Sequence, residues 1–335
     1  MQATKGLQLV LLLGATFTCL AFLNKYPNIS YEIDKTDFFP LSNKLHSKNS
    51  KFNILSQQRL RNIIQQRLKN IEHLCENHNR TRQFETVVSK IIVDIKHGIS
   101  WCPIYKAAST VWMRQFANLG GILTNKTKEL VEKNVVQIST LVNNVYNTEL
   151  NINKTLQNIK ETKIFLVVRH PFERLLSAYR DKLEHKKGRD YYYRRFGRHI
   201  TYKYRKNKKK NTQSEPLFVE FLEFIAKEKY FDEHWIPYTE ICLPCDIKYN
   251  YILKFETFEE ESEFLLLQLG LQDKLDFNWQ KNSTFQIATT KSVIKNYYKN
   301  IPVTLLKKIY NIYEKDFKLF LYTPDEYYSL GKKEF

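Results

Sequence analysis

The sequence has little glycine and little proline, only nine of each in 335 residues. This shortage argues against a disordered chain and against long flexible linkers outside the N-terminal region. Apolar residues make up 43% of the chain, which is enough to build a substantial core. One compact domain is therefore the simplest interpretation.

Acidic residues are also scarce, because 35 Asp and Glu stand against 53 Lys and Arg, for a formal net charge of +18. Such an excess indicates an anionic partner through long-range steering and ion pairing. Nucleic acid, anionic lipid and acidic glycan all qualify, and a merely soluble basic surface is the plain alternative. The Walker pattern G-x-x-x-x-G-K-[ST] is absent from the whole chain, which excludes a Walker-type kinase.

An uncharged apolar run, LQLVLLLGATFTCLAFL, occupies residues 7–23 and is preceded by Lys5 and followed by Asn24 and Lys25. Seventeen residues are at the short end for a membrane span. A cleaved signal peptide is the alternative, but no small-x-small cleavage site follows the run. We expect a cytoplasmic tail at 1–6, a signal anchor at 7–23, a stem at 24–53 and a luminal domain at 54–335.

Cysteines and sequons are consistent with a luminal domain. Beyond Cys19 in the apolar run, four cysteines remain, an even number that can pair in an oxidising compartment: Cys75, Cys102, Cys242 and Cys245. Three pairings are possible, and a zinc site at the single C-x-x-C is an alternative that lacks a matching His pair. Asn-x-Ser/Thr sequons occur at Asn28, Asn79, Asn125, Asn153 and Asn282.

Hydrophobic periodicity predicts the elements of this domain. Residues 54–74 have apolar side chains at helical spacing, and two strand–turn–helix units follow. The first unit has a strand at 99–104 and a helix at 110–119, and the second has a strand at 163–168 and a helix at 172–183. Residues 291–322 also have a helical pattern. Strands alternating with helices predict an α/β domain with a central, mainly parallel sheet flanked by helices and with ligands at the carboxyl ends of its strands.

The turn between the first strand and its helix has the composition of a phosphate cradle. A helix N-terminus offers backbone N–H groups and a positive dipole end to an anion. Lys106 adds a charge and the hydroxyls of Ser109 and Thr110 add donors, while the small Ala107 and Ala108 permit close approach to the backbone. A solvated surface lysine is the plain alternative.

The second turn places Arg169 at a strand end and Ser177 two turns into the following helix. An arginine in that position can hold a phosphate through two parallel hydrogen bonds. Pairing of Arg169 with a nearby carboxylate, and a purely packing role for Ser177, are the alternatives.

Together the two turns resemble a known family, the Golgi carbohydrate sulfotransferases of the chondroitin 4-O-sulfotransferase and HNK-1 sulfotransferase group. The resemblance covers roughly residues 75–324, with the order of the blocks preserved. The blocks that carry it are PIYKAASTVWMRQF, IFLVVRHPFERLLSAYRDKLE, HWIPYTEICLPCDIKYNYILKFETFEEE and a C-terminal segment from Ala288 through NYYKNIP to YEKDFKLFLYTP.

The resemblance implies a P-loop-like sulfotransferase fold and the donor 3′-phosphoadenosine 5′-phosphosulfate (PAPS), with no metal. It implies that Lys106 contacts the oxygen between phosphate and sulfate, and that the first turn, Ala107, Ala108, Ser109 and Thr110 included, holds the 5′-phosphosulfate. Arg169 and Ser177 are implied as ligands of the 3′-phosphate.

A general base must take the proton of the acceptor hydroxyl, and an imidazole is well suited near neutral pH. His234 in the segment DEHWIP is our prediction for this catalytic role beside Lys106. A histidine packed on Trp235 is the alternative for His234, and Glu256 is a second candidate base.

Residues 186–210 hold twelve Lys or Arg and one acidic residue, with tyrosines between them. This segment is too irregular for a helix that reads DNA, so nucleic acid is not the expected partner. We expect a basic loop at the rim of an acidic-glycan groove, and a solvated loop is the alternative. The predicted acceptor-binding residues are Arg205, Lys206, Lys208, Lys209 and Lys210.

Three positions depart from the family pattern. Tyr105 stands where Pro is usual, His170 where an acidic residue is usual, and Leu321 where Gly precedes Tyr322. These departures concern the acceptor more than the donor. The resemblance therefore implies a Golgi membrane enzyme that transfers a sulfuryl group to the 4-hydroxyl of N-acetylgalactosamine in chondroitin-type chains. Another hydroxyl, on glucuronate or in dermatan, and a silent glycan-binding protein are the alternatives.

Overall fold

A computed structural model describes residues 53–149, 151–206, 213–275 and 288–333. The predicted tail, anchor and most of the stem lie outside these ranges. No helix in the described part of the chain combines the length and the apolar character needed to cross a membrane. The helices, in chain order, are α2 (Ile54–Leu74), α3 (Phe84–Val88), α4 (Ser109–Leu119), α5 (Asn125–Glu132), α6 (Ile138–Tyr146), α7 (Ile152–Glu161), α8 (Pro171–Lys182), α9 (Asp190–Tyr192), the π-helix η1 (Tyr193–Gly197), α10 (Arg198–Tyr204), α11 (Phe218–Glu228), α12 (Tyr238–Ile241), the 3₁₀ turn η2 (Phe255–Thr257), α13 (Phe258–Leu269), α15 (Ala288–Tyr298), α16 (Val303–Leu319) and α17 (Asp325–Leu330).

The described strands form one four-stranded sheet in the order β1 (Ile92–Asp94), β2 (Ile99–Trp101), β3 (Lys163–Val168) and β4 (Tyr251–Lys254). The β1–β2 pair is antiparallel, while β2–β3 and β3–β4 are parallel. In this register Phe165 lies between Trp101 and Tyr251. The prediction of a mainly parallel sheet flanked by helices is confirmed.

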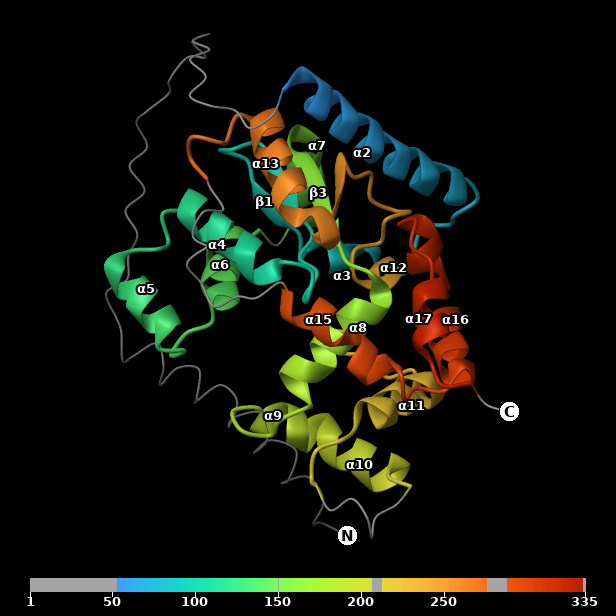
Figure 1. Ribbon diagram of the computed structural model, residues 1–335. Helices are drawn as coiled ribbons and strands as arrows, with labels where there is room; N and C mark the ends of the chain where they lie inside the picture. Colours follow the sequence, from blue (N-terminus) through green and yellow to red (C-terminus); the bar gives the residue numbers. More distant parts are fainter. Residues whose placement is uncertain (1–52, 150, 207–212, 276–287, 334–335) are drawn as a thin grey trace, which may run out of the picture. The chain divides into compact units, whose positions relative to one another are not determined.

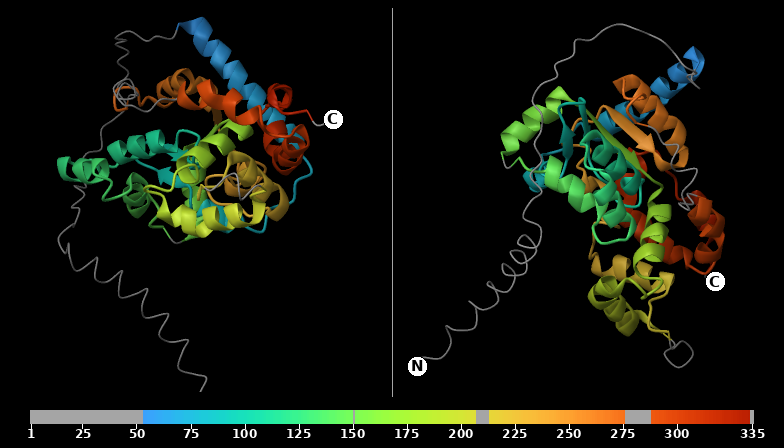
Figure 2. Two further views of the ribbon diagram at one scale, coloured as in Figure 1. Left: turned by 60° about the horizontal axis from the view of Figure 1, so that its bottom comes forward. Right: turned by 90° about the vertical axis from the view of Figure 1, so that its left-hand side faces the viewer.

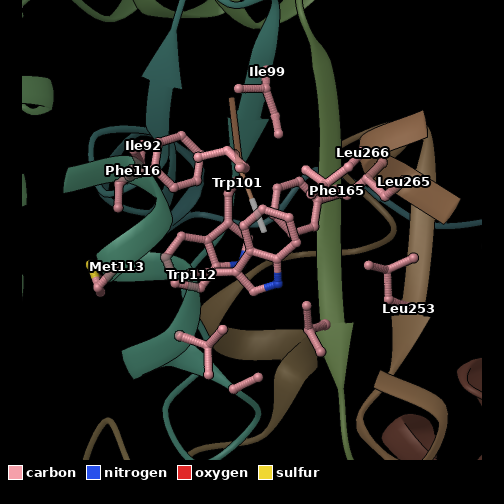
Figure 3. Close-up of a cluster of buried hydrophobic side chains, with 14 of the residues drawn as sticks. Ile92, Ile99, Trp101, Trp112, Met113, Phe116, Phe165, Leu253, Leu265 and Leu266 are labelled. Carbon is pink, nitrogen blue, oxygen red and sulfur yellow. The ribbon is translucent and has the colours of Figure 1, made fainter. Parts of the chain in front are cut away.

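The strand β3 separates two hydrophobic clusters, because its side chains alternate between the two faces of the sheet. Phe165 and Val167 belong to a cluster with Trp101 and Trp112, which α2, α4 and α13 help to form (Figure 3). Ile164, Leu166 and Val168 belong to the opposite cluster, to which α3, α7 and α12 contribute. Burial on both faces explains why the predicted strand at 163–168 is apolar almost throughout.

A third cluster contains no strand and is built from α8, α10, α11, α15, α16 and α17. In Figures 1 and 2 the helices α8 to α11 lie beyond the carboxyl end of β3. This helical layer therefore covers the edge of the sheet formed by the carboxyl ends of its parallel strands, where the turns after β2 and β3 lie.

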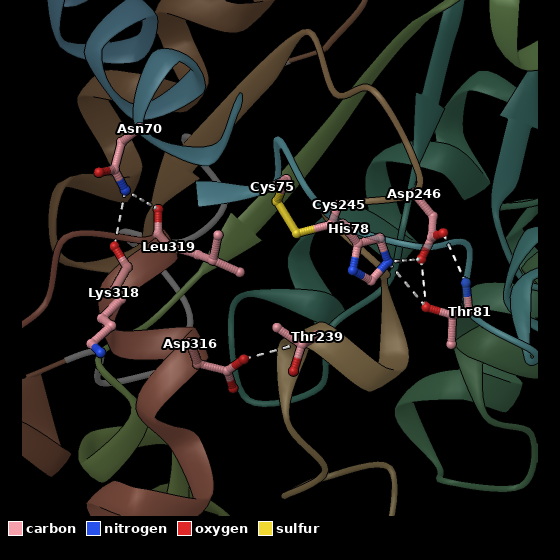
Figure 4. The surroundings of a disulfide bond; sticks show 10 residues. All are labelled: Asn70, Cys75, His78, Thr81, Thr239, Cys245, Asp246, Asp316, Lys318 and Leu319. Carbon is pink, nitrogen blue, oxygen red and sulfur yellow. Dashed lines mark hydrogen bonds and ion pairs between the residues drawn. A yellow bond between two sulfur atoms is a disulfide. The ribbon is translucent and has the colours of Figure 1, made fainter. Parts of the chain in front are cut away.

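Two disulfides fasten the segment after α12 to the sheet layer. Cys102 pairs with Cys242, and Cys75 at the end of α2 pairs with Cys245, so the two C-x-x-C sulfurs have separate partners and do not share a zinc site. Around Cys75–Cys245, Asp246 accepts hydrogen bonds from the N–H and hydroxyl of Thr81 (Figure 4). The amide of Asn70 donates to the carbonyls of Lys318 and Leu319, which also ties α2 to the end of α16.

Four expectations about the elements need correction. The strand predicted at 99–104 ends at Trp101, since Pro103 in the turn has no N–H for the sheet ladder. The C-terminal helical pattern is two helices, separated before Pro302. Within the basic segment, residues 190–204 form a helical run where a loop was expected. Arg67 of α2 faces the core and not solvent. Its Nη1 and Nη2 bind the buried carboxylate of Glu261 at 2.6 and 2.8 Å.

Candidate active site

The turn that joins β2 to α4 has an unusual backbone. Lys106 and Ala108 both have positive φ, 70° and 63°, a left-handed conformation that side chains disfavour. The chain thereby reverses within a few residues and starts α4 at Ser109, whose first N–H groups have no partner inside the helix. Strain of this kind is often found at functional sites.

Lys106 is held by a carboxylate from α8. Its Nζ lies 3.1 Å from Oδ2 of Asp181, which also pairs with Lys182 at 3.2 Å and with Arg189 at 2.8 Å. Burial lowers the pKa of Lys106, and the charge of Asp181 opposes that effect. Burial likewise opposes ionisation of Asp181, but Lys106 and its other cationic neighbours outweigh burial and hold the pKa of that carboxyl below its usual range.

The turn after β3 presents Arg169, whose side chain is only 4% exposed. Its Nε and Nη2 lie 3.3 and 3.1 Å from Oε2 of Glu173, and its guanidinium carbon lies 4.3 Å from the centre of the Phe255 ring. Nη1 donates to the carbonyl of Lys106 at 3.4 Å, so the two turns are in direct contact. The pairing of Arg169 with a carboxylate, which was one of the alternatives, is therefore present.

Both turns line one cavity of about 790 Å³. The predicted residues on its wall are Lys106, Ala108, Ser109, Thr110, Arg169, Ser177 and His234. Ala107 is not on the wall, because its side chain is fully buried beneath the turn and its N–H donates to Ile104. The structure thus gathers side chains that are far apart in the sequence into one pocket with cationic groups on its wall.

His234 lies on the same wall with its imidazole held by an aspartate. Nδ1 is 2.6 Å from Oδ1 of Asp232 and 3.2 Å from the hydroxyl of Tyr192, and the ring packs on Tyr105 at 4.8 Å between centres. Because Asp232 accepts from Nδ1–H, the neutral ring keeps its lone pair on Nε2. Burial lowers the pKa of His234, and the positive charges of Lys182 and Lys106 lower it further. The hydrogen bond and charge of Asp232 act in the opposite direction and raise it. A neutral imidazole of this kind can accept a proton.

Glu256, the second candidate base, is occupied elsewhere. Its carboxylate accepts from the N–H of His170 at 2.7 Å and from the hydroxyl of Tyr322 at 2.8 Å. It does not line the cavity. Glu256 therefore fastens the C-terminal segment to the second turn and is withdrawn as a base.

The predicted acceptor residues fall into three groups. Arg205 is buried and binds Glu220 with Nε and Nη2, at 2.5 and 3.0 Å, so the expectation that it faces an acceptor is wrong. The exposed side chain of Lys206 lies 3.0 Å from Glu223. Lys208, Lys209 and Lys210 lie outside the described residues. Among the described residues of the basic segment, those that line the cavity run from Gly188 to Tyr192.

The three departures from the family pattern have distinct environments. Tyr105 lines the cavity against His234. His170 is buried with Nε2 at 2.9 Å from the carbonyl of Thr323, and burial lowers its pKa to about 4. Leu321 has φ 54°, the left-handed conformation that glycine adopts without cost.

Sequence reasoning missed the carboxylates that hold Arg169, Lys106 and His234, namely Glu173, Asp181 and Asp232 in that order. Glu173 and Asp232 stand four and two positions from their partners, a weak signal because such pairs are common. Asp181 is 75 residues from Lys106 and gives no local signal. Within the described ranges, no group of three or more His, Cys, Asp and Glu residues is placed to hold a metal ion.

Comparison with known proteins agrees with this geometry. Residues 89–323 match the model of the sulfotransferase family. Human carbohydrate sulfotransferase 9 is 30% identical over 308 residues, covering 90% of this chain and 67% of the relative. Rat carbohydrate sulfotransferase 11 is 30% identical, and the match covers 72% of this chain and 69% of the relative. Carbohydrate sulfotransferase 12 of Xenopus laevis is 29% identical, and the match covers 92% of this chain and 84% of the relative. No solved structure matches. The chain therefore belongs to the sulfotransferase family, and it is an enzyme of the carbohydrate sulfotransferase type that transfers sulfate.

Proposed function

We propose that this enzyme transfers a sulfuryl group from PAPS to the 4-hydroxyl of N-acetylgalactosamine in chondroitin-type chains. One observation supports this most strongly: Lys106, Arg169 and His234 line a single cavity, and Asp232 holds the His234 imidazole from outside its wall. A site with two cations and a neutral imidazole suits the joining of an anionic donor to a hydroxyl acceptor.

The donor is proposed to lie across the two turns. Ser109, Thr110 and the N-terminus of α4 bind the 5′-phosphosulfate, and Arg169 and Ser177 bind the 3′-phosphate. Glu173 and Phe255 keep the guanidinium of Arg169 in one orientation, which lowers the entropy lost on binding.

The reaction is a direct displacement at sulfur. The acceptor oxygen attacks, the bond between sulfur and the bridging oxygen of PAPS breaks, and the hydroxyl proton passes to Nε2 of His234. Lys106 stabilises the charge that develops on the departing phosphate oxygen. Asp232 stabilises the imidazolium that results, because its carboxylate lies 2.6 Å from Nδ1.

We propose a Golgi membrane location, with the catalytic domain in the lumen behind a single N-terminal anchor. The apolar run at 7–23 supports the anchor. The two disulfides support an oxidising compartment, and the sequon asparagines Asn79, Asn125 and Asn153 are all exposed. Protease protection of the domain in intact microsomes, lost on adding detergent, is the corresponding test.

The function is tested with the full chain in detergent, radiolabelled PAPS and a panel of desulfated chondroitin, dermatan, heparan and small glycans. Disaccharide analysis should place the label on the 4-hydroxyl of N-acetylgalactosamine in chondroitin. Label on glucuronate or in dermatan would replace the acceptor but keep the chemistry. No transfer to any acceptor, with no binding of the desulfated donor, would leave only a silent glycan-binding protein.

A further inference from the structure

An exposed tyrosine and an exposed arginine stand side by side at the edge of the cavity. Tyr191 of α9 lines the cavity although its side chain is 56% exposed. Arg195, one helical turn later in η1, donates from Nη1 to the Tyr191 hydroxyl at 2.5 Å, with its guanidinium carbon 5.7 Å from the ring centre. The pair therefore presents an aromatic ring and a cation together on one face.

Tyr230 extends this surface from a different segment, the loop after α11. It is 50% exposed, and its ring centre lies 5.8 Å from that of Phe196, a ring that the Arg195 guanidinium also approaches, at 4.9 Å. The backbone carbonyl of Tyr230 accepts from the indole of the buried Trp235 at 3.2 Å, next to His234 in the chain. We name Tyr191, Arg195 and Tyr230 the aromatic–arginine shelf.

The shelf adjoins the imidazole that is proposed to act as the base. Arg195 Nη1 lies 3.9 Å from Oδ2 of Asp232, whose other oxygen holds His234. Tyr192, next to Tyr191, packs edge-on against the His234 ring at 5.6 Å between centres. His234 and Tyr191 line the same cavity, so a glycan whose hydroxyl lies at His234 can extend along the wall towards the shelf.

The chemistry of the shelf fits an acidic pyranose. The apolar face of a sugar ring packs well on an exposed tyrosine ring, and a guanidinium binds a carboxylate through two parallel hydrogen bonds. Two other arginines of the segment have closer carboxylate partners than Arg195 has. Arg205 is buried on Glu220, and Arg189 is engaged by Asp181. The Arg195 side chain is 39% exposed, and its Nη1 lies 3.9 Å from the carboxylate of Asp232.

We propose that the aromatic–arginine shelf binds the uronic acid next to the sulfated sugar, with its carboxylate on Arg195 and its ring face on Tyr191. This inference rests on the proposed function, since it assigns the acceptor end of the same cavity. It assigns acceptor recognition to an earlier part of the basic segment than the predicted residues Arg205, Lys206, Lys208, Lys209 and Lys210.

The test uses chondroitin and carboxyl-reduced chondroitin, in which glucuronate has become glucose. Arg195→Gln should raise the acceptor KM and the acceptor Kd about tenfold for chondroitin, the usual worth of one charged contact. It should change neither value for the reduced chain, and the KM for PAPS should stay the same. Tyr191→Ala should weaken both acceptors, because both keep the sugar ring face.

Arg198→Gln and Tyr202→Ala are the matched controls, because both residues are exposed, lie in α10 and do not line the cavity. An equal effect of Arg195→Gln on both acceptors, or none beyond that of Arg198→Gln, would overturn the shelf. Binding is measured with 3′-phosphoadenosine 5′-phosphate present and without turnover. Arg195-dependent binding without transfer would therefore contradict the proposed function alone, and transfer without Arg195 dependence would contradict the shelf alone.

Discussion

Three carboxylates hold the three side chains that the proposed reaction needs. Asp181 binds Lys106, Glu173 binds Arg169, and Asp232 binds His234, at 3.1, 3.1 and 2.6 Å. Each pair is largely withdrawn from water. In such surroundings opposite charges attract more strongly, and a charge left without its partner costs more free energy. The site is therefore organised by acidic residues even though the chain is strongly basic.

Asp232→Asn should change how activity depends on pH. The unprotonated imidazole is the active form, so activity falls as the pH drops through the pKa of His234. Asp232 raises that pKa against the effect of burial, and its loss should move the acid limb of the kcat/KM profile to lower pH. The plateau should also fall, by up to the roughly 10²–10⁴-fold that a general base contributes. Asparagine lacks the charge that stabilises the imidazolium, and its NH2 group can donate to Nδ1 and favour the tautomer whose Nε2 carries the proton.

The measurement is a pH–rate profile of wild type, Asp232→Asn and His234→Ala, with the KM for PAPS as the control. A variant with an unchanged acid limb and plateau would mean that Asp232 only supports the fold. His234→Ala should lose the limb altogether.

Sequence alone pointed to residues that line the cavity better than to their carboxylate partners. Lys106, Arg169 and His234 follow strands or sit in a distinctive segment, so their types and positions carried a signal. Asp181 did not, since only the fold brings α8 to the first turn. Arg205 was assigned wrongly, because an arginine in a basic run looks the same whether it meets solvent or a buried Glu220.

Among the elements, the end of α16 carries a local conflict between sequence and backbone. Tyr322 N–H bonds to the carbonyl of Phe317 and Leu321 N–H to that of Lys318, the pattern of a Schellman cap. The residue that turns the chain in this cap is normally glycine, and here it is Leu321 with φ 54°. The cap also positions Tyr322, which donates to Glu256 beneath the second turn.

Leu321→Gly should therefore stabilise the protein. Relief of the left-handed strain, less the entropy that glycine adds to the unfolded chain, is worth about 0.5–1 kcal/mol. For a domain of this size that raises Tm by roughly 1–4 °C. Thermal unfolding is the measurement, and Leu321→Ala is the control because it removes the side chain but keeps Cβ. Glycine melting below alanine would contradict the account.

Elements with strong periodicity were predictable to the residue. The helix at 54–74 and the strand at 163–168 have the expected bounds. The basic segment was expected as a loop because its charges hide the apolar positions Phe196, Ile200 and Tyr204, which are buried in the helical layer. Tertiary burial of a few side chains thus decided its conformation.

At the scale of the whole molecule, the cavity lies where the sheet layer meets the helical layer. Its walls come from the turns after β2 and β3, from α6 and α8, and from the start of the basic segment. The two disulfides fix the segment that follows His234 to β2 and α2, with Cα–Cα distances of 6.0 and 5.3 Å. This pairing could not come from spacing, because four cysteines permit three arrangements and only the fold selects one.

The most direct test of the central claim is calorimetric binding of 3′-phosphoadenosine 5′-phosphate to the full chain. Wild type should bind, and Arg169→Ala should bind roughly 10–100-fold more weakly, the loss expected for charged hydrogen bonds to a phosphate. Ser177→Ala should show a smaller loss without disturbing the Arg169–Glu173 pair, and Arg198→Ala should match wild type. Equal affinity of all four proteins, or no binding by wild type, would contradict the account.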